Sequence, residues 1–211
     1  MESAQRKAHW ENVYATKPLQ SVGWYQPVPE PSLSLIAGLR LPPVARIIDI
    51  GGGDSLLADH LLQLGYHNLT VLDLSAAAIE RARKRLGPLA DRVEWVVSDV
   101  LDFRPNRCYD LWHDRAAFHF LTSKDEQEAY LHTAAGALCP GGNLIVGTFS
   151  EKGPTRCSGL EIQQYSAQSM EVFFSGELCA AGFQEAVHHT PGGAVQHYIF
   201  GTFTKPEPAG H

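Results

Sequence analysis

The chain has 211 residues, of which 44% are hydrophobic and 19% charged, and its formal net charge is −6 at pH 7. This length and composition predict a soluble globular protein made of one domain with some elaboration. The negative charge argues against a nucleic-acid binder, which would normally carry a basic patch, while leaving room for a local basic pocket.

The sequence gives no targeting or membrane signal. The stretch MESAQRKAHWENVY lacks the apolar region of a signal peptide, and no segment approaches the roughly 18 consecutive apolar residues of a membrane helix. We therefore expect a cytoplasmic protein with no membrane contact. The four cysteines, Cys108, Cys139, Cys157 and Cys179, form no CxxC pair, and we expect them to be reduced thiols.

Residues 1–40 are predicted to form a cover or lid segment ahead of the main domain. The stretch AHWENVYA predicts a short helix, YQPVPEPS is a proline-broken loop, and Pro31 can open a helix through Ser32–Leu39. The main domain is expected to span residues 41–205. Residues 206–211 are expected to be a flexible tail.

From residue 45 onward, strand-like and helix-like segments alternate. Apolar, β-branched runs predict five strands at 45–50, 69–74, 92–100, 108–115 and 140–150. Helical periodicity predicts helices at 55–65, 76–87, 123–138 and 166–182, with Ser75 and Ser123 as N-caps and Gly65 as a C-cap. Two final strands, 183–190 and 194–205, are joined by the turn PGG.

This order predicts an α/β fold of the doubly wound, Rossmann-like class: a seven-stranded sheet that ends in an antiparallel hairpin. In such sheets the ligand binds in the crevice at the carboxyl ends of the strands. Functional residues are therefore expected in the segments that follow strands, namely 49–55, 73–75, 98–100, 113–119 and 149–157.

The most informative of these segments is RIIDIGGGDS, where three glycines follow a buried strand. Glycine permits positive φ and lets the backbone approach a ligand closely. Leu56 stands where a dinucleotide fingerprint has its third glycine, and the pattern lacks the Lys-Ser/Thr of a P-loop. Asp49 would repel a pyrophosphate but suits an ammonium group. Asp73 can accept from ribose hydroxyls and Asp99 from a base edge, so the set favours a cationic adenosine derivative.

These segments resemble the motifs of class I S-adenosylmethionine-dependent methyltransferases. The family's first motif is matched by DIGGGDS, with Ser55 where a third glycine is commonest, and later motifs by VLDLS, VVSDV and LCPGGNLIV. The matches follow in order over residues 45–149, half of the chain. The resemblance implies S-adenosylmethionine as cofactor.

The resemblance also implies roles for individual residues. Asp49 and the glycines would hold the methionine end, Asp73 the ribose, and Asp99 the adenine amino group. The N-terminal aromatic residues would form a lid similar to that of thiopurine and thiol methyltransferases. The full set of expected cofactor contacts is Trp10, Tyr14, Trp24, Asp49, Gly51, Gly52, Gly53, Ser55, Asp73, Leu74, Ser75, Ser98, Asp99, Val100, Asp114 and Arg115.

Candidate catalytic and metal-binding residues lie mostly in the second half of the chain. Histidine is the usual general base near neutral pH, and His119 is the first candidate and His189 the second. The group His188, His189, His197 and Cys157 matches no zinc motif, so we expect no metal. The segments RCSGL and HHTPGGAVQHY resemble uncharacterised bacterial-type methyltransferases, a likeness that implies no substrate.

The function that this pattern favours is methyl transfer to a small-molecule acceptor by in-line displacement. Proximity and orientation can supply roughly 7–11 kcal/mol of the barrier in such a reaction, so no side-chain nucleophile is required. Three alternatives stay open: a protein (lysine) methyltransferase, a non-catalytic S-adenosylmethionine-binding protein, and a nicotinamide dehydrogenase.

Overall fold

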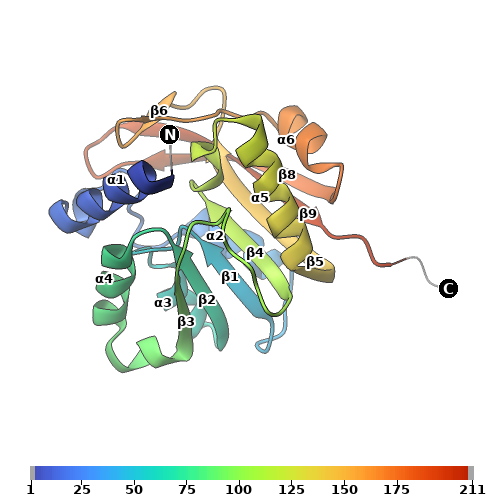
Figure 1. The fold of residues 1–211 in the computed structure, drawn as a ribbon, viewed down its shortest axis with the longest axis horizontal. Coiled ribbons are helices and arrows are strands. Elements are labelled where there is room, and N and C mark those ends of the chain that lie inside the picture. The colour runs from blue at the N-terminus through green and yellow to red at the C-terminus, as the bar shows by residue number, and fades with distance from the viewer. Residues whose placement is uncertain (1–2, 209–211) are drawn as a thin grey trace.

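The computed structural model describes residues 3–208, which form a central seven-stranded sheet in the order β3-β2-β1-β4-β5-β9-β8 (Figure 1). Strands β1 to β5 are parallel, and β9 runs antiparallel to both β5 and β8. This confirms the predicted doubly wound sheet with a terminal antiparallel hairpin. The strands are β1 Arg46–Ile50, β2 Asn68–Asp73, β3 Val93–Val97, β4 Tyr109–Arg115, β5 Leu138–Phe149, β8 Cys179–His189 and β9 Val195–Thr204.

Helices pack on both faces of the sheet, and a separate two-stranded hairpin follows β5. The helices are α1 Ser3–Thr16, α2 Glu30–Gly38, α3 Leu57–Gln63, α4 Ala76–Leu86, α5 Lys124–Ala137 and α6 Ala167–Phe174, with short 3-10 turns at Leu19–Ser21, Gly87–Arg92 and Phe118–Phe120. The hairpin is formed by β6 Arg156–Cys157 and β7 Leu160–Glu161. Both predicted serine N-caps are confirmed: Ser75 accepts from the Ala78 N–H and Ser123 from the Glu126 N–H.

Alternation along the strands divides the interior into two cores. Successive side chains of a strand point to opposite faces. Ile48, Ile50 and Trp112 therefore pack on the face covered by α5 and α6, whereas Ile47 and Leu111 pack on the face covered by α2, α3 and α4. Because both faces are buried, the parallel strands are almost continuously apolar, which is the pattern read from the sequence.

One helix is shorter than predicted. The sequence suggested a helix over 166–182, but α6 ends at Phe174 and strand β8 begins at Cys179. Residues 179–182 pair with β9, with an irregularity between Ala180 and Gly182. Pairing with the sheet edge has overridden the helix preference of the alanines, as tertiary context commonly does.

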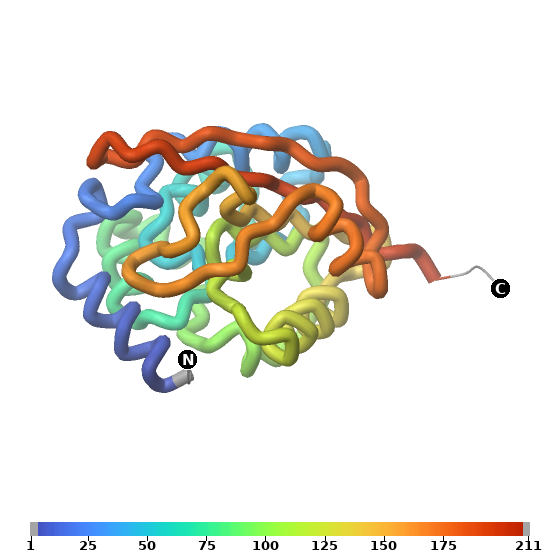
Figure 2. The backbone as a smooth tube through the Cα atoms, turned by 90° about the horizontal axis from the view of Figure 1, so that it is seen from above, coloured from blue at the N-terminus to red at the C-terminus, as the bar shows by residue number. Residues whose placement is uncertain are grey.

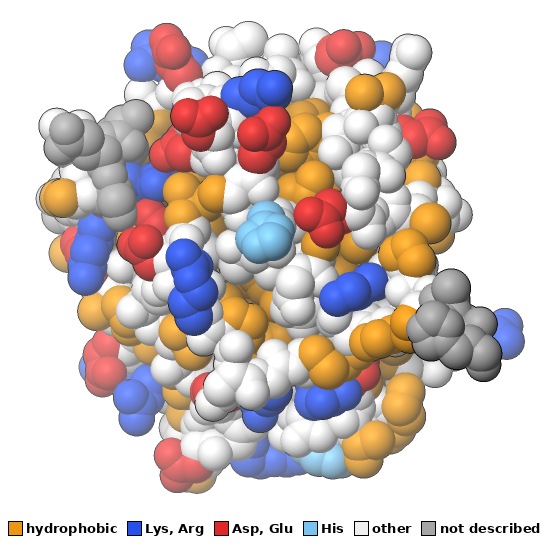
Figure 3. All heavy atoms as spheres, turned by 45° about the vertical axis from the view of Figure 1, so that its right-hand side comes forward, with side chains coloured by type: hydrophobic (Ala, Val, Ile, Leu, Met, Phe, Trp, Pro, Cys, Tyr) orange, Lys and Arg blue, Asp and Glu red, His pale blue; other side chains and the backbone are white. Residues whose placement is uncertain are grey.

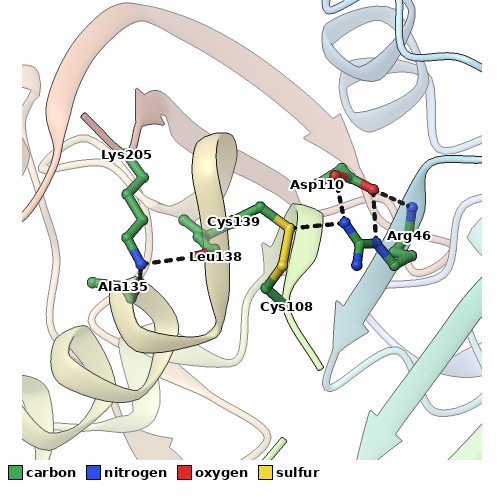
Figure 4. The surroundings of a disulfide bond; sticks show 7 residues. All are labelled: Arg46, Cys108, Asp110, Ala135, Leu138, Cys139 and Lys205. Carbon is green, nitrogen blue, oxygen red and sulfur yellow. Dashed lines mark hydrogen bonds and ion pairs between the residues drawn. A yellow bond between two sulfur atoms is a disulfide. The ribbon is translucent and has the colours of Figure 1, made fainter. Parts of the chain in front are cut away.

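The prediction that all four cysteines are reduced is wrong for two of them. Cys108 and Cys139 form a disulfide, with their Cα atoms 5.0 Å apart (Figure 4). One lies just before β4 and the other near the start of β5, so the pairing of these strands brings them together although 31 positions separate them. Cys157 and Cys179 are free.

The edges of the described region bear on two further expectations. No helix within residues 3–208 is long and apolar enough to cross a membrane. The predicted tail, 206–211, lies partly outside the described residues, and 206–208 form neither helix nor strand.

On the face shown in Figure 3, the acidic, basic and hydrophobic side chains of the described residues are interspersed.

Candidate functional site

A cavity that is open to solvent lies at the carboxyl ends of β1, β2 and β4. The N-terminal helix, the segment around β6 and β7, and the tip of the β8–β9 hairpin, which are far apart in sequence, lie at one end of the molecule (Figure 2). The first two contribute Trp10 and Cys157 to the cavity lining. Most residues expected at the cofactor line this cavity, namely Trp10, Tyr14, Trp24, Asp49, Gly51, Gly52, Ser55, Asp73, Leu74, Ser98, Asp99, Val100 and Arg115.

Two of the three glycines leave room for the chain's own carboxylates, and the third leaves room for Ala117. Gly51 has φ +63°, and a Cβ on it would lie 2.8 Å from the Cβ of Ala117. A Cβ on Gly52 would overlap the Asp49 carboxylate, and one on Gly53 would overlap the Asp73 carboxylate. Gly53 does not line the cavity. The turn therefore lets two carboxylates sit directly beneath the backbone that faces the cavity.

Asp49 is held by a buried hydrogen-bonded chain that the sequence reading did not identify. Its Oδ1 lies 2.7 Å from His113 Nδ1, and His113 Nε2 lies 2.8 Å from the Ser32 hydroxyl. All three residues are buried and line the cavity. The signal was available in the sheet order: β1 pairs with β4 in parallel, with Asp49 directly opposite His113. These hydrogen bonds link helix α2 to the end of β1.

Asp73 ends β2 and is almost fully buried. The N–H of Ser75 donates to its Oδ1 at 2.8 Å. Ser75, which was expected to contact the cofactor, does not line the cavity and instead holds Asp73 from behind. Burial raises the pKa of Asp73 to about 7, and the nearby charges of Asp49 and Glu11 act in the same direction. About half of the Asp73 carboxyl groups are therefore ionised at neutral pH, and the ionised form, which accepts hydrogen bonds from hydroxyl groups, gains as the pH rises.

Glu11 fastens helix α1 to the elements that follow β2. Its carboxylate accepts hydrogen bonds from the Ser75 hydroxyl at 2.9 Å and from the N–H groups of Ala76 and Ala77 at 2.8 and 3.1 Å. These backbone groups are the unpaired donors at the start of α4, where negative charge is favoured. The hydrogen bonds lower the pKa of Glu11 against the opposing effect of burial.

Asp99 is engaged by a second residue of the same helix. Arg6 Nη2 donates to Asp99 Oδ2 at 3.0 Å, and Arg6 Nη1 donates to Glu126 at 3.0 Å. The N–H of Leu101 donates to the other Asp99 oxygen at 3.1 Å. Arg6 is buried and lines the cavity, and no sequence motif pointed to it.

Asp114 lies behind the cavity wall rather than on it. Its carboxylate is fully buried and accepts hydrogen bonds from the N–H groups of Ala117 and Phe118 and from the Tyr130 hydroxyl. Burial raises its pKa to about 6. The Asp114 carboxylate thus holds the backbone of the turn that follows β4. Arg115, the next residue, lines the cavity.

Neither histidine predicted as a general base lines the cavity. The His119 ring packs between Phe120 and Phe149, with centroids 4.6 and 4.9 Å away, and its Nδ1 accepts from the Phe149 N–H. Burial lowers the pKa of His119 to about 3, so the ring is neutral at physiological pH. His189 is exposed on β8, while its neighbour His188 is buried on the opposite face.

Aromatic rings cover the cavity opposite the strand ends. Trp10 lies 5.7 Å from Trp24 and 5.1 Å from Phe120, measured between ring centroids, and Tyr14 contacts both tryptophans. His188 Nε2 donates to the Gly23 carbonyl at 2.8 Å, which ties this cover to β8. Among the described residues, no three His, Cys, Asp or Glu side chains gather as a metal site requires.

The comparisons with known proteins agree with this geometry. A family model described as "Methyltransferase domain" matches residues 47–142. Over 114 residues the chain is 29% identical to Nodulation protein S of Rhizobium tropici, covering 54% of this chain and 47% of that protein. Over 176 residues it is 28% identical to the ubiquinone/menaquinone biosynthesis C-methyltransferase UbiE of Ruegeria sp. (strain TM1040), covering 69% of each. The chain thus spans about half the length of the first relative.

A solved structure supports the fold. The chain superposes on the 1,6-didemethyltoxoflavin-N1-methyltransferase of Burkholderia thailandensis with a TM-score of 0.71 at 18% identity, covering 98% of this chain and 92% of that one. The glycine turn, which a Cβ would fill, and the buried carboxylates Asp49, Asp73 and Asp99 fit a cationic adenosine derivative. Residues 47–142 thus match a methyltransferase domain, and the chain has the fold of the class I S-adenosylmethionine-dependent methyltransferases.

Proposed function

We propose that this chain methylates a small-molecule acceptor bound between the strand ends and the aromatic cover. The observation that carries the proposal is the cavity itself: three carboxylates and a glycine turn form its floor, and Trp10 and Trp24 form part of its cover. The neighbour from Burkholderia thailandensis is named for a small-molecule acceptor, 1,6-didemethyltoxoflavin, which supports the same class here.

The cofactor contacts follow from the positions of the buried carboxylates. Asp49, oriented by His113, would accept hydrogen bonds from the ammonium group of S-adenosylmethionine. Asp73 would accept hydrogen bonds from the ribose hydroxyls, and Asp99 would accept one from the adenine amino group. When bound, the cofactor supplies a methyl group already activated on a sulfonium.

The chain's own contribution is then positioning and exclusion of water. Holding two reactants in line can contribute roughly 7–11 kcal/mol. His119 has a low pKa and lies behind the wall, and both ring nitrogens of His113 are already hydrogen-bonded. The proposed acceptor is therefore one whose reacting atom gives up its proton without a side-chain base.

Calorimetric titration with S-adenosylhomocysteine tests the cofactor site. We expect micromolar binding by the wild type, at least tenfold weaker binding by Asp73→Ala, and no binding of NADH. Asp102→Ala is the matched control, because this aspartate is exposed one turn beyond β3. A preference for NADH would contradict the proposal.

Methyl transfer is then followed with a radiolabelled methyl donor and a fractionated cell extract. Label in the small-molecule fraction is the expected result. Label in protein would instead identify a protein (lysine) methyltransferase. Binding of S-adenosylhomocysteine without transfer to either fraction would indicate a non-catalytic cofactor-binding protein.

A further inference from the structure

Arg115 presents an unpaired hydrogen-bond donor beside the aromatic cover. It is the last residue of β4 and lines the cavity together with Trp24 and Cys157. Its Nη2 donates to the Trp24 carbonyl at 2.8 Å. Its Nη1 is buried and has no hydrogen-bond partner within residues 3–208, and in that part of the chain Arg115 forms no ion pair.

The ionisable groups around this guanidinium do not neutralise it. Those whose titration Arg115 influences are Tyr14, His119, Cys157, His188 and Tyr198. Burial raises the pKa of Cys157 to about 11, raises the pKa values of both tyrosines, and lowers those of both histidines, so all five are neutral at pH 7. Lys17, which also acts on Cys157, adds positive charge.

Two carboxylates that act on Tyr14, as Arg115 does, already have partners. They are Asp54 and Asp73. Asp54 is paired with Arg81 and Arg85, and Asp73 accepts from the Ser75 N–H. A buried cationic donor without a partner is costly, and an anion bound in the cavity would remove that cost.

The surrounding rings restrict the shape of such an anion. Trp10 meets both Trp24 and Phe120 edge-to-face, with interplanar angles of 76° and 78°. Aromatic rings that line a cavity pack well against another flat π-system, offset-stacked or edge-to-face. Because Nη2 donates to Trp24 while Nη1 has no partner, the N–H groups of Nη1 are the ones that Arg115 offers for charge-assisted hydrogen bonds.

We propose that the acceptor is a planar aromatic acid whose anionic oxygen binds Nη1 of Arg115 while its ring packs against the aromatic cover. This inference rests on the proposed function and names its substrate class. It also assigns a role to the segment RCSGL and to the histidine segment of β8, for which the sequence indicated no substrate. These segments bring Cys157 and His188 to this end of the cavity, where both are neutral neighbours of the Arg115 cation.

The test compares a charged and a neutral probe of nearly the same shape. Protein saturated with S-adenosylhomocysteine is titrated by calorimetry with 1-naphthoate and with 1-naphthamide. We expect the wild type to bind the carboxylate at least tenfold more tightly than the amide. In Arg115→Gln this preference should disappear while amide binding is retained, and the exposed Arg104→Gln should behave as the wild type.

The outcomes separate this inference from the proposed function. Equal affinity for the two probes in the wild type, or binding of neither, would overturn the aromatic-acid acceptor while leaving cofactor binding intact. Loss of S-adenosylhomocysteine binding in Arg115→Gln would assign this residue to the cofactor's carboxylate and also overturn it. Failure of the wild type to bind S-adenosylhomocysteine would overturn the proposed function and this inference with it. The wild-type comparison does not depend on the folding of any variant.

Discussion

The two sides of the cavity are built in different ways. The floor comes from short segments at the ends of β1, β2 and β3, where each carboxylate lies in or just after its strand. The cover and the Arg115 region combine α1 and the loop around Trp24 with β6 and β8, which lie more than a hundred positions further along the chain. Local sequence fixes the chemistry of the floor, whereas tertiary packing fixes that of the cover. The two sides should therefore respond differently to substitution.

The largest effect is expected on the floor, from Gly52→Ala. The added Cβ would overlap the Asp49 carboxylate and lie 3.0 Å from Val71, so the strand end must shift. Overpacking of this kind costs about 1–3 kcal/mol, and we expect affinity for S-adenosylhomocysteine to fall by up to about 100-fold. Calorimetry measures the loss. Gly136→Ala, on helix α5 with open space around it, is the matched control and should bind normally.

An effect of similar size is expected from His113→Phe. This change removes both hydrogen bonds of the Ser32–His113–Asp49 chain and leaves the Asp49 carboxylate without its orienting partner. Loss of a hydrogen bond to a charged group costs roughly 1.5–3 kcal/mol, which corresponds to about 10- to 100-fold in cofactor affinity. The exposed His67→Phe serves as control.

A double-mutant cycle distinguishes orientation of Asp49 from a general packing role of His113. If His113 acts through Asp49, adding Asp49→Asn to His113→Phe should weaken binding little further. Fully additive losses would contradict the coupling and would assign His113 a separate role in the cavity wall.

A pH effect should follow from Asp73. Its pKa of about 7 means that the carboxylate is mostly protonated at lower pH and loses acceptor capacity for ribose hydroxyls. Affinity for S-adenosylhomocysteine should be full above about pH 8 and fall about tenfold by about pH 6, since binding favours the ionised form. Asp73→Asn should bind more weakly at every pH and remove this dependence. An unchanged slope in Asp73→Asn would assign the titration to another group.

The sequence predicted the floor well because its residues obey local rules. A strand followed by glycines and a carboxylate is recognisable without knowing what lies opposite. Arg6, Ser32 and His113 were missed because their roles depend on contacts across 93, 81 and 64 positions. The Cys108–Cys139 disulfide escaped prediction for the same reason, since strand pairing rather than spacing unites it. His119 looked suitable by type, and only the fold shows that its ring is packed away from the cavity.

The smallest effect is expected where the two sides are joined, at Glu11. Glu11→Ala removes three acceptor contacts at the start of α4, which hold helix α1 over the floor. Losing an N-terminal cap of this kind costs about 1 kcal/mol, so S-adenosylhomocysteine should dissociate about fivefold faster while the carboxylates beneath it stay in place. Hydrogen exchange over residues 3–16 should accelerate, whereas exchange in β1 and β2 should not. Glu128→Ala, on the exposed face of α5, is the control. Faster exchange throughout the sheet would show that Glu11 supports the fold as a whole, and the floor and the cover would then not be separable units.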